Sequence, residues 1–289
     1  MNFHRIAVTG PGGQLGSALR AHLGPRALPV DRSTLPLDRP DAVGPALQTL
    51  RPDAIINCGA YVAVDKAEQE SELCFRTNAE TPAAMAEACA RLDIPLVQIS
   101  TDYVYCRSER REPHREVDPI SPDGVYARSK AAGEQAALKA PRSLVVRTCG
   151  LYGVTPRKAN FVETMLRLGG EGRRLRVVDD QTCTPSHVAD VARAVVHLLD
   201  REATGIVNVT NRGFVTWFDF ANEIFRQSEM HVEVEPITSA QFGAPAPRPA
   251  YSVLDCGLYE SLGGPPLPFW QEALAAYLSA RTQPESSAP

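Results

Sequence analysis

A glycine-rich turn directly after the first apolar segment constrains the fold of this chain most strongly. Gly10, Gly13 and Gly16 are spaced three residues apart, follow the apolar residues 6–8 and open the helical pattern of residues 14–22. Such a turn lets a helix begin close against a strand, and it presents the N–H groups at the helix N-terminus to phosphate. Glycine-rich turns also occur without a ligand, but this position favours dinucleotide binding.

The first 150 residues alternate between short apolar runs and helical patterns, which is typical of a parallel sheet with helices on both faces. Strands are predicted at 6–8, 28–30, 54–57, 96–99 and 144–146, and helices at 14–22, 42–50, 72–92 and 126–139. A hydrophobic fraction of 44% is sufficient for a packed core. The predicted fold is an α/β Rossmann-type doubly wound parallel sheet with a smaller C-terminal lobe.

The second half of the chain has a less regular pattern. Helices are predicted at 161–168, from Thr184-Pro185 to about 199, at 216–227 and at 269–280, with strands at 174–178 and 206–209. We therefore expect a dinucleotide-binding domain over 1–150, to which part of 184–210 returns. We expect residues 151–282 to form mainly a substrate lobe and residues 283–289 to form a flexible tail.

Charge and cysteine usage narrow the class of protein. A net charge of -4 gives no sign of a nucleic-acid or membrane partner. The seven cysteines are scattered without a C-x-x-C pair, and the N-terminus shows no signal peptide, so we expect reduced thiols in a cytoplasmic protein. The six histidines form no ligand spacing, and no metal site is expected.

Tyr126 and Lys130 form a Y-x-x-x-K motif on a predicted helix. The spacing puts both side chains on one face of the helix. A free phenol titrates near pH ~10, and a nearby ammonium is expected to lower the pKa of Tyr126 enough for it to act as a proton donor. This spacing is also common on solvated helix faces, but Lys130 is one of only four lysines in the chain.

Polar residues also follow two of the predicted strands. Thr101 and Asp102 come where the fourth strand ends, at the sheet edge where ligands bind, and Thr101 is placed to bind a substrate carbonyl or simply to cap the strand. Asp31 ends the second strand, where an acidic residue binds adenosine ribose, or it serves only the turn. Arg32 beside it would instead favour a 2′-phosphate, so NADH and NADPH both stay open as the cofactor.

These segments together resemble the dTDP-4-dehydrorhamnose reductases, within the extended short-chain dehydrogenases. The resemblance covers nearly the whole chain and is carried by the glycine turn and by residues 56–61, 63–68 (A-V-D-K-A-E), 100–105 (S-T-D-Y-V-Y), 126–134, 160–168, 178–181 (V-D-D-Q) and 248–255. The family implies NAD(P)H-dependent reduction of the 4-keto group of a nucleotide-linked 6-deoxy sugar.

The resemblance also implies roles for individual residues. Tyr126 would donate the proton, Lys130 would assist it and bind ribose, and Thr101 would orient the carbonyl. The implied cofactor residues are Gly10, Gly13, Gln14, Leu15, Gly16, Asp31, Arg32, Asp38, Gly59, Ala60, Tyr61 and Lys130. Thr101, Asp102 and the segment at Gly150 would contact the sugar.

The chain departs from the family pattern in four places. Cys106-Arg107 replaces a common Asp-Gly, and the following loop is basic, which suits either a solvated surface or a substrate diphosphate. Gly150 stands where some members have a substrate-facing tryptophan. Ala18 stands where magnesium-binding members have glutamate, which argues against the metal and its associated dimer contact.

Three functions therefore stay open. The leading one is a reductase of a nucleotide-linked keto sugar, acting as a monomer or a homodimer. The second is a nucleotide-sugar epimerase or dehydratase, which would keep its cofactor bound. The third is a non-catalytic dinucleotide-binding protein like the related regulatory subunit of methionine adenosyltransferase, although the complete Thr–Tyr–Lys set weighs against it.

Overall fold

The computed structural model describes residues 3–154 and 160–282. The predicted tail at 283–289 lies outside these residues. The centre of the fold is a six-stranded, wholly parallel sheet in the order β10-β5-β4-β3-β1-β2. Its strands are β1 (Ile6–Thr9), β2 (Ala27–Val30), β3 (Ala54–Asn57), β4 (Leu96–Thr101), β5 (Ser143–Thr148) and β10 (Gly205–Asn208).

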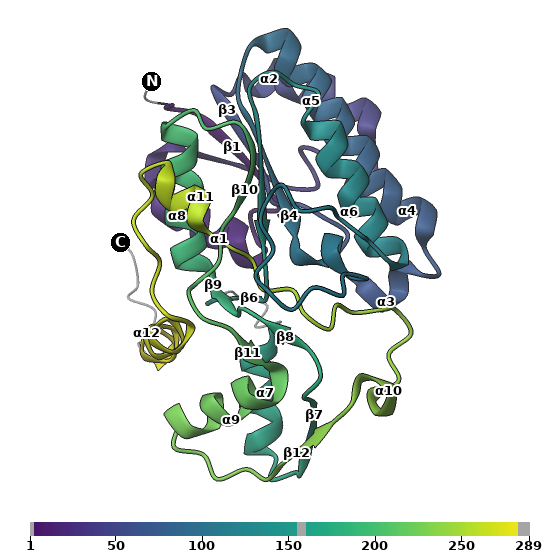
Figure 1. Cartoon of the computed structure of the whole chain (residues 1–289). Helices are drawn as coiled ribbons and strands as arrows, with labels where there is room; N and C mark the ends of the chain where they lie inside the picture. Colours follow the sequence, from purple (N-terminus) through teal and green to yellow (C-terminus); the bar gives the residue numbers. More distant parts are fainter. Residues whose placement is uncertain (1–2, 155–159, 283–289) are drawn as a thin grey trace.

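Helices cover both faces of this sheet, which confirms the predicted Rossmann-type α/β fold (Figure 1). One face packs against α1 (Gln14–Leu23) and α8 (Val188–Asp200), and the other against α2 (Val43–Leu50), α5 (Thr81–Leu92) and α6 (Gly124–Ala137). Successive residues of a strand point to opposite faces, so Val8 and Ile56 join the first core while Ala7 and Ile55 join the second. Strands buried on both faces read as continuous apolar runs, as the sequence does here.

The strand order reverses between β1 and β3. The chain leaves β1 for β2 on one side, and it then returns to place β3 on the other side. Open α/β sheets bind their ligands at such a switch point, outside the carboxyl ends of the strands. Short helices α3 (Val64–Ala67) and α4 (Ser71–Phe75) and a π-helical turn at Arg76–Glu80 follow β3 and lead into α5.

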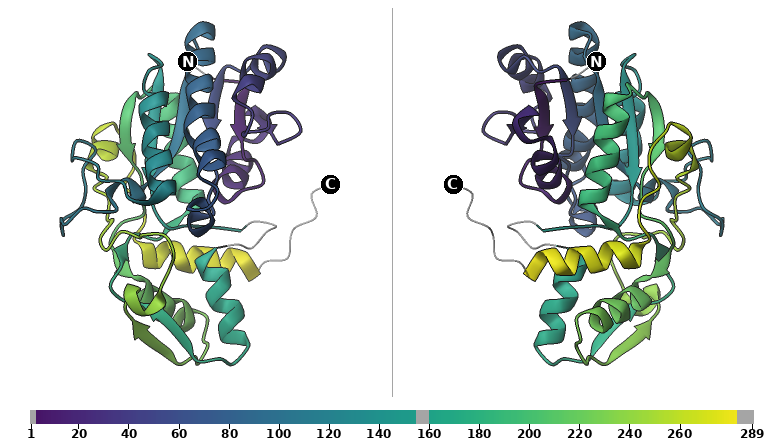
Figure 2. Two further views of the ribbon diagram at one scale, coloured as in Figure 1. Left: turned by 90° about the vertical axis from the view of Figure 1, so that its right-hand side faces the viewer. Right: turned by 90° about the vertical axis from the view of Figure 1, so that its left-hand side faces the viewer.

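A smaller lobe lies below the carboxyl end of the sheet (Figures 1 and 2). It contains the parallel pair β7 (Leu175–Val178) and β12 (Val234–Ile237), with α7 (Phe161–Gly170), α9 (Trp217–Gln227), α10 (Ser239–Phe242) and α12 (Trp270–Thr282). The aromatic core of this lobe includes Tyr152, Phe220, Phe225, Trp270 and Tyr277. Figure 2 shows α12 lying between the sheet domain and the rest of the lobe.

Short strand pairs connect the two parts. They are β6 (Leu151–Tyr152) with β9 (Ser186–His187) and β8 (Thr182–Cys183) with β11 (Val215–Thr216), and α11 (Gly257–Ser261) packs back on the sheet domain. The predicted helix start at Thr184-Pro185 is wrong. The Thr184 hydroxyl donates to the carbonyl of Gly213, and residues 186–187 pair as a strand before α8 begins at Val188.

Candidate active site

The glycine-rich turn and the loop after β3 meet at the switch point of the sheet. Gly10 has a φ of +62°, and a Cβ atom there would lie 3.0 Å from both the N and the Cα of Gly59. A Cβ atom on Gly16 would lie 2.2 Å from the carbonyl oxygen of Gly10. Glycine is therefore required at both positions by this close approach of the two backbones.

The N-terminus of α1 opens from this turn. Gly13 is its N-cap residue, no side chain caps the helix, and its first turn contains no acidic residue. No carboxylate of this turn therefore competes with an anion for the N–H groups at the helix N-terminus. A backbone cradle of glycines beside an uncapped helix N-terminus fits the pyrophosphate of a dinucleotide.

The end of β2 places Asp31, Arg32 and Asp38 at the surface. The Asp31 carboxylate accepts hydrogen bonds from the N–H and the hydroxyl of Ser33, at 2.9 and 2.6 Å, and from the N–H of Thr34. The hydrogen bond from the Ser33 side chain is the largest of the effects that lower the pKa of Asp31. Asp31 thus serves its own turn while remaining an exposed, ionised acceptor.

The loop Gly59–Ala60–Tyr61 is fixed by Asn78, a residue that no sequence motif singles out. The Asn78 side chain accepts from the N–H of Tyr61 at 2.9 Å and donates to its carbonyl at 3.1 Å. It also donates to the hydroxyl of Ser129, which in turn donates to the carbonyl of Tyr126. One buried amide thereby ties the loop after β3 to α6.

The structure brings Thr101 and Tyr126 together at the carboxyl edge of the sheet. Thr101 ends β4, Tyr126 lies in the first turn of α6, and the Thr101 hydroxyl lies near enough to the phenol to lower its pKa. The ring of Tyr103 packs edge-on against that of Tyr126, with 5.5 Å between the ring centroids. A phenol and an aliphatic hydroxyl therefore converge at the place where a ligand would bind.

The local sequence explains why α6 begins where it does. The Asp123 side chain accepts from the N–H of Gly124, and the Glu68 carboxylate accepts from the N–H of Val125 at 2.7 Å. Gly124 has a φ of +77°, and a side chain there would meet Glu68 and Pro247. These caps set the height and direction at which Tyr126 leaves the helix.

Lys130 lies one turn further along α6, with 5% of its surface exposed. Its ammonium donates to the carbonyl oxygen of Ile99 at 2.6 Å. That carbonyl also accepts from the Gln98 amide, which is linked through Asn57 to Thr9 on β1. A chain of hydrogen bonds across three strands thus fixes the position of the ammonium.

The expected lowering of the phenol pKa is not what the structure gives. Burial raises the pKa of Tyr126 well above its ordinary value, and the nearby Thr101 hydroxyl offsets only part of this effect. Burial also lowers the pKa of Lys130 to about 8. Desolvation of both groups outweighs the stabilisation that the sequence argument assigned to their proximity.

The two other predicted substrate residues lie beside this pair. Asp102 is 4% exposed, and its carboxylate accepts from the Thr101 hydroxyl and from the Cys149 thiol, each at 3.0 Å. Gly150 has a φ of +54°, and a Cβ atom there would lie 3.1 Å from Pro185 and 3.4 Å from the Trp217 ring. The indole of Trp217, at the start of α9, therefore reaches the segment at Gly150.

Comparison with known proteins agrees with this geometry. A family profile described as the RmlD substrate binding domain matches residues 4–283. The chain belongs to this family. It is 40% identical to a dTDP-4-dehydrorhamnose reductase of Mycobacterium tuberculosis, over 96% of this chain and 93% of that protein.

Two further relatives are informative. A protein of Streptomyces antibioticus, named a probable dTDP-4,6-dihydroxy-2-methyloxan-3-one 4-ketoreductase, is 39% identical over 93% of each chain. The crystal structure of dTDP-4-dehydrorhamnose reductase from Bacillus anthracis in complex with NADP superposes with a TM-score of 0.92 at 36% identity, over 96% of this chain and 99% of that one. Both similarities extend through the sheet domain and the lobe.

The basic loop that departs from the family pattern is largely neutralised by its own acidic residues. Arg107 pairs with Asp123, and Arg110 and Arg115 both pair with Asp118. His114 is buried and stacks on Tyr105, with 4.1 Å between the ring centroids. These contacts favour a solvated, internally paired loop over a diphosphate site.

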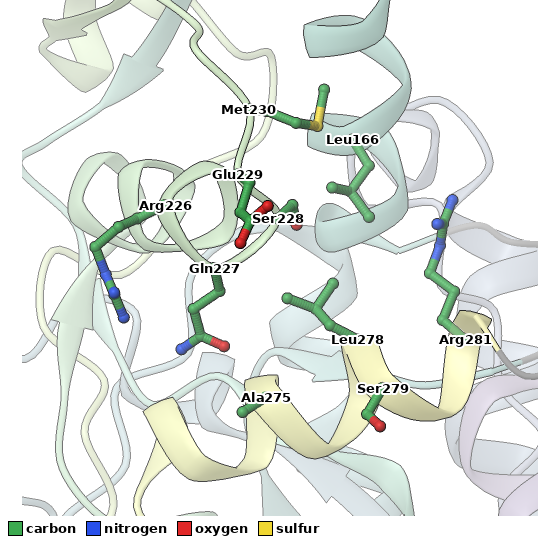
Figure 3. A pocket seen from close by; sticks show the side chains of 10 residues that line it. All are labelled: Leu166, Arg226, Gln227, Ser228, Glu229, Met230, Ala275, Leu278, Ser279 and Arg281. Atoms are coloured by element: carbon green, nitrogen blue, oxygen red, sulfur yellow. The ribbon is translucent and has the colours of Figure 1, made fainter.

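A hollow of about 830 Å³ lies away from this site, between α7, α9 and α12 (Figure 3). Its two arginines are both paired, Arg226 with Glu223 and Arg281 with Glu163, so neither is available to bind a charged group of a ligand.

Within residues 3–154 and 160–282, no group of three His, Cys, Asp or Glu side chains lies close enough together to bind a metal ion. No helix in the described part of the chain has the length and hydropathy to span a bilayer.

Proposed function

We propose that this protein is an NAD(P)H-dependent reductase of the 4-keto group of dTDP-4-dehydro-L-rhamnose, with dTDP-L-rhamnose as the product. The observation that carries the proposal is the convergence of Thr101, at the end of β4, and Tyr126, in the first turn of α6, at the same sheet edge as the glycine cradle. The named reductases at 36–40% identity over nearly the whole chain support it.

The bound cofactor would supply a hydride to the keto carbon. Tyr126 would donate its phenolic proton to the oxygen that becomes the new hydroxyl, and Thr101 would hydrogen-bond the same oxygen and orient the carbonyl. Lys130, held by the Ile99 carbonyl, would place its positive charge beside the nicotinamide ribose and the phenolate. Trp217 and the segment at Gly150 would form the wall on the side of the lobe.

For the cofactor, we propose that Gly10, Gly13 and Gly16 surround the pyrophosphate while Gly59, Ala60 and Tyr61 line the cleft. Asp31 would accept hydrogen bonds from the adenosine ribose, and Asp38 would lie near the adenine. Arg32 follows Asp31 at the same exposed turn and would pair with a 2′-phosphate, so both NADH and NADPH are expected to bind. Asp31→Ala would weaken NADH binding more than NADPH binding, and Arg32→Ala would do the reverse.

A turnover assay tests the function directly. NADPH or NADH oxidation is followed with dTDP-4-dehydro-L-rhamnose and with other 4-keto-6-deoxy nucleotide sugars. Tyr126→Phe should lower kcat by about 10²–10⁴-fold, the usual effect of removing a general acid. Tyr259→Phe is the matched control, because that ring lies on α11 in the core beside α1 and α8 and not with Thr101 and Tyr126. A Tyr126→Phe variant as fast as the parent protein would contradict the proposed mechanism.

The same assay separates the other functions. Cofactor that stays bound through purification, without net oxidation of added NADPH, would favour an epimerase or dehydratase. Cofactor binding without any turnover, together with co-purification of a synthetase, would favour a regulatory subunit.

All seven cysteines are free thiols, and we propose a cytoplasmic location on that basis. The division into a cofactor domain and a substrate lobe is proposed together with this function.

A further inference from the structure

Trp217, the first residue of α9, lies where the smaller lobe meets the carboxyl edge of the sheet. The preceding residue, Thr216, fixes its place: the Thr216 hydroxyl accepts from the N–H of Asp219 and donates to the Asp179 carboxylate at 2.8 Å. Strand β11, which ends at Thr216, pairs with β8. In Figure 1 these two strands lie between the sheet and the body of the lobe. The indole is therefore held at a well-anchored junction.

Two rings of the lobe pack against the indole, and its outer edge points to Gly150. The rings of Phe161 and Phe220 contact it, with 4.7 and 6.2 Å between the ring centroids. The carbon at the far end of the indole, Cη2, would lie 3.4 Å from a Cβ atom on Gly150. Glycine has no such atom, so no side chain at this position covers the edge of the ring, and Trp217 stays partly exposed.

The backbone at Gly150 leads directly to the proposed reacting groups. The preceding residue, Cys149, donates from its thiol to the Asp102 carboxylate at 3.0 Å, and the Thr101 hydroxyl donates to the same side chain at 3.0 Å. Neighbouring Cα atoms of a chain are about 3.8 Å apart. A single residue, Cys149, thus separates the backbone that the indole reaches from the carboxyl group beside Thr101.

A partly exposed indole beside a few buried polar groups suits a ligand that has both hydroxyl groups and an apolar side. The pyranose ring of a 6-deoxy sugar has this character, because it presents C–H groups and a methyl group in place of a hydroxymethyl group. Thr101 has to reach the keto oxygen of the same sugar. The closeness of Trp217 to this site therefore favours the sugar over the nucleotide base as the group that contacts the indole.

We propose that Trp217 is a specificity-determining residue, whose outer ring packs against the apolar side of the sugar, including its methyl group, while Thr101 binds the keto oxygen. The absence of a side chain at Gly150 leaves the edge of the ring open for this contact. This inference rests on the proposed reductase function. It assigns recognition of the sugar ring to one side chain of the lobe.

The experiment compares the binding of dTDP-L-rhamnose and of dTDP by calorimetry in the presence of NADP+. The dissociation constant of dTDP divided by that of dTDP-L-rhamnose measures what the sugar contributes. Trp217→Phe keeps a ring against Phe161 but removes the part that reaches Gly150, and this ratio should fall about 5–10-fold because only the sugar contact weakens. Phe218→Leu is the matched control, since this ring packs on the same core but points to another side of α9. It should leave the ratio unchanged.

Tryptophan fluorescence gives a second readout that locates the contact. The chain contains two tryptophans, and the other, Trp270, is buried in the core of the lobe. In Trp270→Phe, the emission of Trp217 should change when dTDP-L-rhamnose is added and should stay constant when dTDP is added. In Trp217→Phe, where Trp270 alone emits, neither ligand should change the emission.

An unchanged binding ratio in Trp217→Phe, or an emission of Trp217 that does not respond to dTDP-L-rhamnose, would overturn the inference even if the protein reduces the keto sugar. A parent protein that binds dTDP-L-rhamnose no more tightly than dTDP would overturn it as well. The expected ratio and emission changes in a protein that reduces none of the keto sugars would show instead that the proposed function fails while Trp217 contacts the sugar.

Discussion

Asp65 and Arg248, 183 positions apart in the sequence, form a bidentate ion pair between α3 and the segment that follows α10. The two guanidinium nitrogens donate to the two carboxylate oxygens at 3.0 and 2.8 Å, and the N–H of Ala246 donates to the same carboxylate at 3.1 Å. Arg248 also acts electrostatically on Tyr103, whose ring packs on Tyr126. The pair therefore joins the C-terminal segment to the wall of the active site.

A double-mutant cycle measures the strength of this pair. Arg248→Met and Asp65→Asn are made alone and together, and urea unfolding should give a coupling energy of about 1 kcal/mol. Bidentate pairing is expected to give a larger coupling energy than a usual surface ion pair, even though Asp65 is 45% exposed. The exposed helical pair Arg167 and Glu171 is the control and should give less than about 0.5 kcal/mol. Equal coupling in the two cycles would mean that the Asp65–Arg248 pair is only a surface contact.

The glycine turn gives a second prediction. Gly16→Ala should weaken NADPH binding by at least about 10-fold, because the new methyl group would overlap the Gly10 carbonyl and force the turn to move. Gly12→Ala is the control in the same turn, since a Cβ atom there meets nothing within 4 Å. Titration of each variant with NADPH, followed by fluorescence, gives the dissociation constants. Similar constants for the two variants would contradict the steric argument.

Much of the sheet domain could be predicted from sequence, because buried parallel strands and the glycine turn leave strong local patterns. The structure of the smaller lobe was harder to predict from its sequence. The strand at Val234–Ile237 contains a proline and is only partly buried. Neither its composition nor an alternation of apolar and polar residues therefore predicted a strand there. The start of α8 was misplaced because Thr184 and Pro185 resemble a helix start, while pairing of Ser186 with Leu151, a non-local contact, decides the structure.

The candidate site likewise contains residues that local sequence patterns indicate and residues that they do not. Tyr126, Lys130 and Thr101 could be proposed from the sequence because their spacing and their position at the predicted sheet edge carry the signal. Asn78 was missed, since it acts through contacts with segments more than 15 residues away. The pKa of Tyr126 was predicted in the wrong direction because helix spacing gives proximity to Lys130 but says nothing about the burial of either group.

Glu134 and Arg147 form the most deeply buried ion pair described here, with side chains 3% and 2% exposed. Two guanidinium nitrogens bind the carboxylate at 3.0 and 2.7 Å, and the Ser100 hydroxyl donates to it as well. Glu134→Gln should lower the unfolding free energy by about 3–5 kcal/mol, because it leaves the guanidinium buried without a counter-charge. Glu223→Gln, at the surface pair with Arg226, should cost less than about 1 kcal/mol. Urea unfolding of both variants measures these changes, and equal losses of unfolding free energy would contradict the prediction.

The pH dependence of the reaction should report Lys130. Its pKa is lowered to about 8 by burial, so the ammonium is present below that pH and is lost as the pH rises above it. Without this charge the phenolate of Tyr126 is no longer stabilised, and kcat should fall about 10-fold for each pH unit above 8. Lys130→Arg keeps its charge across this range. Its kcat should be lower than that of the parent near neutral pH but should stay level up to pH ~10. A descending limb at the same pH in the parent and in Lys130→Arg would assign the titration to another group.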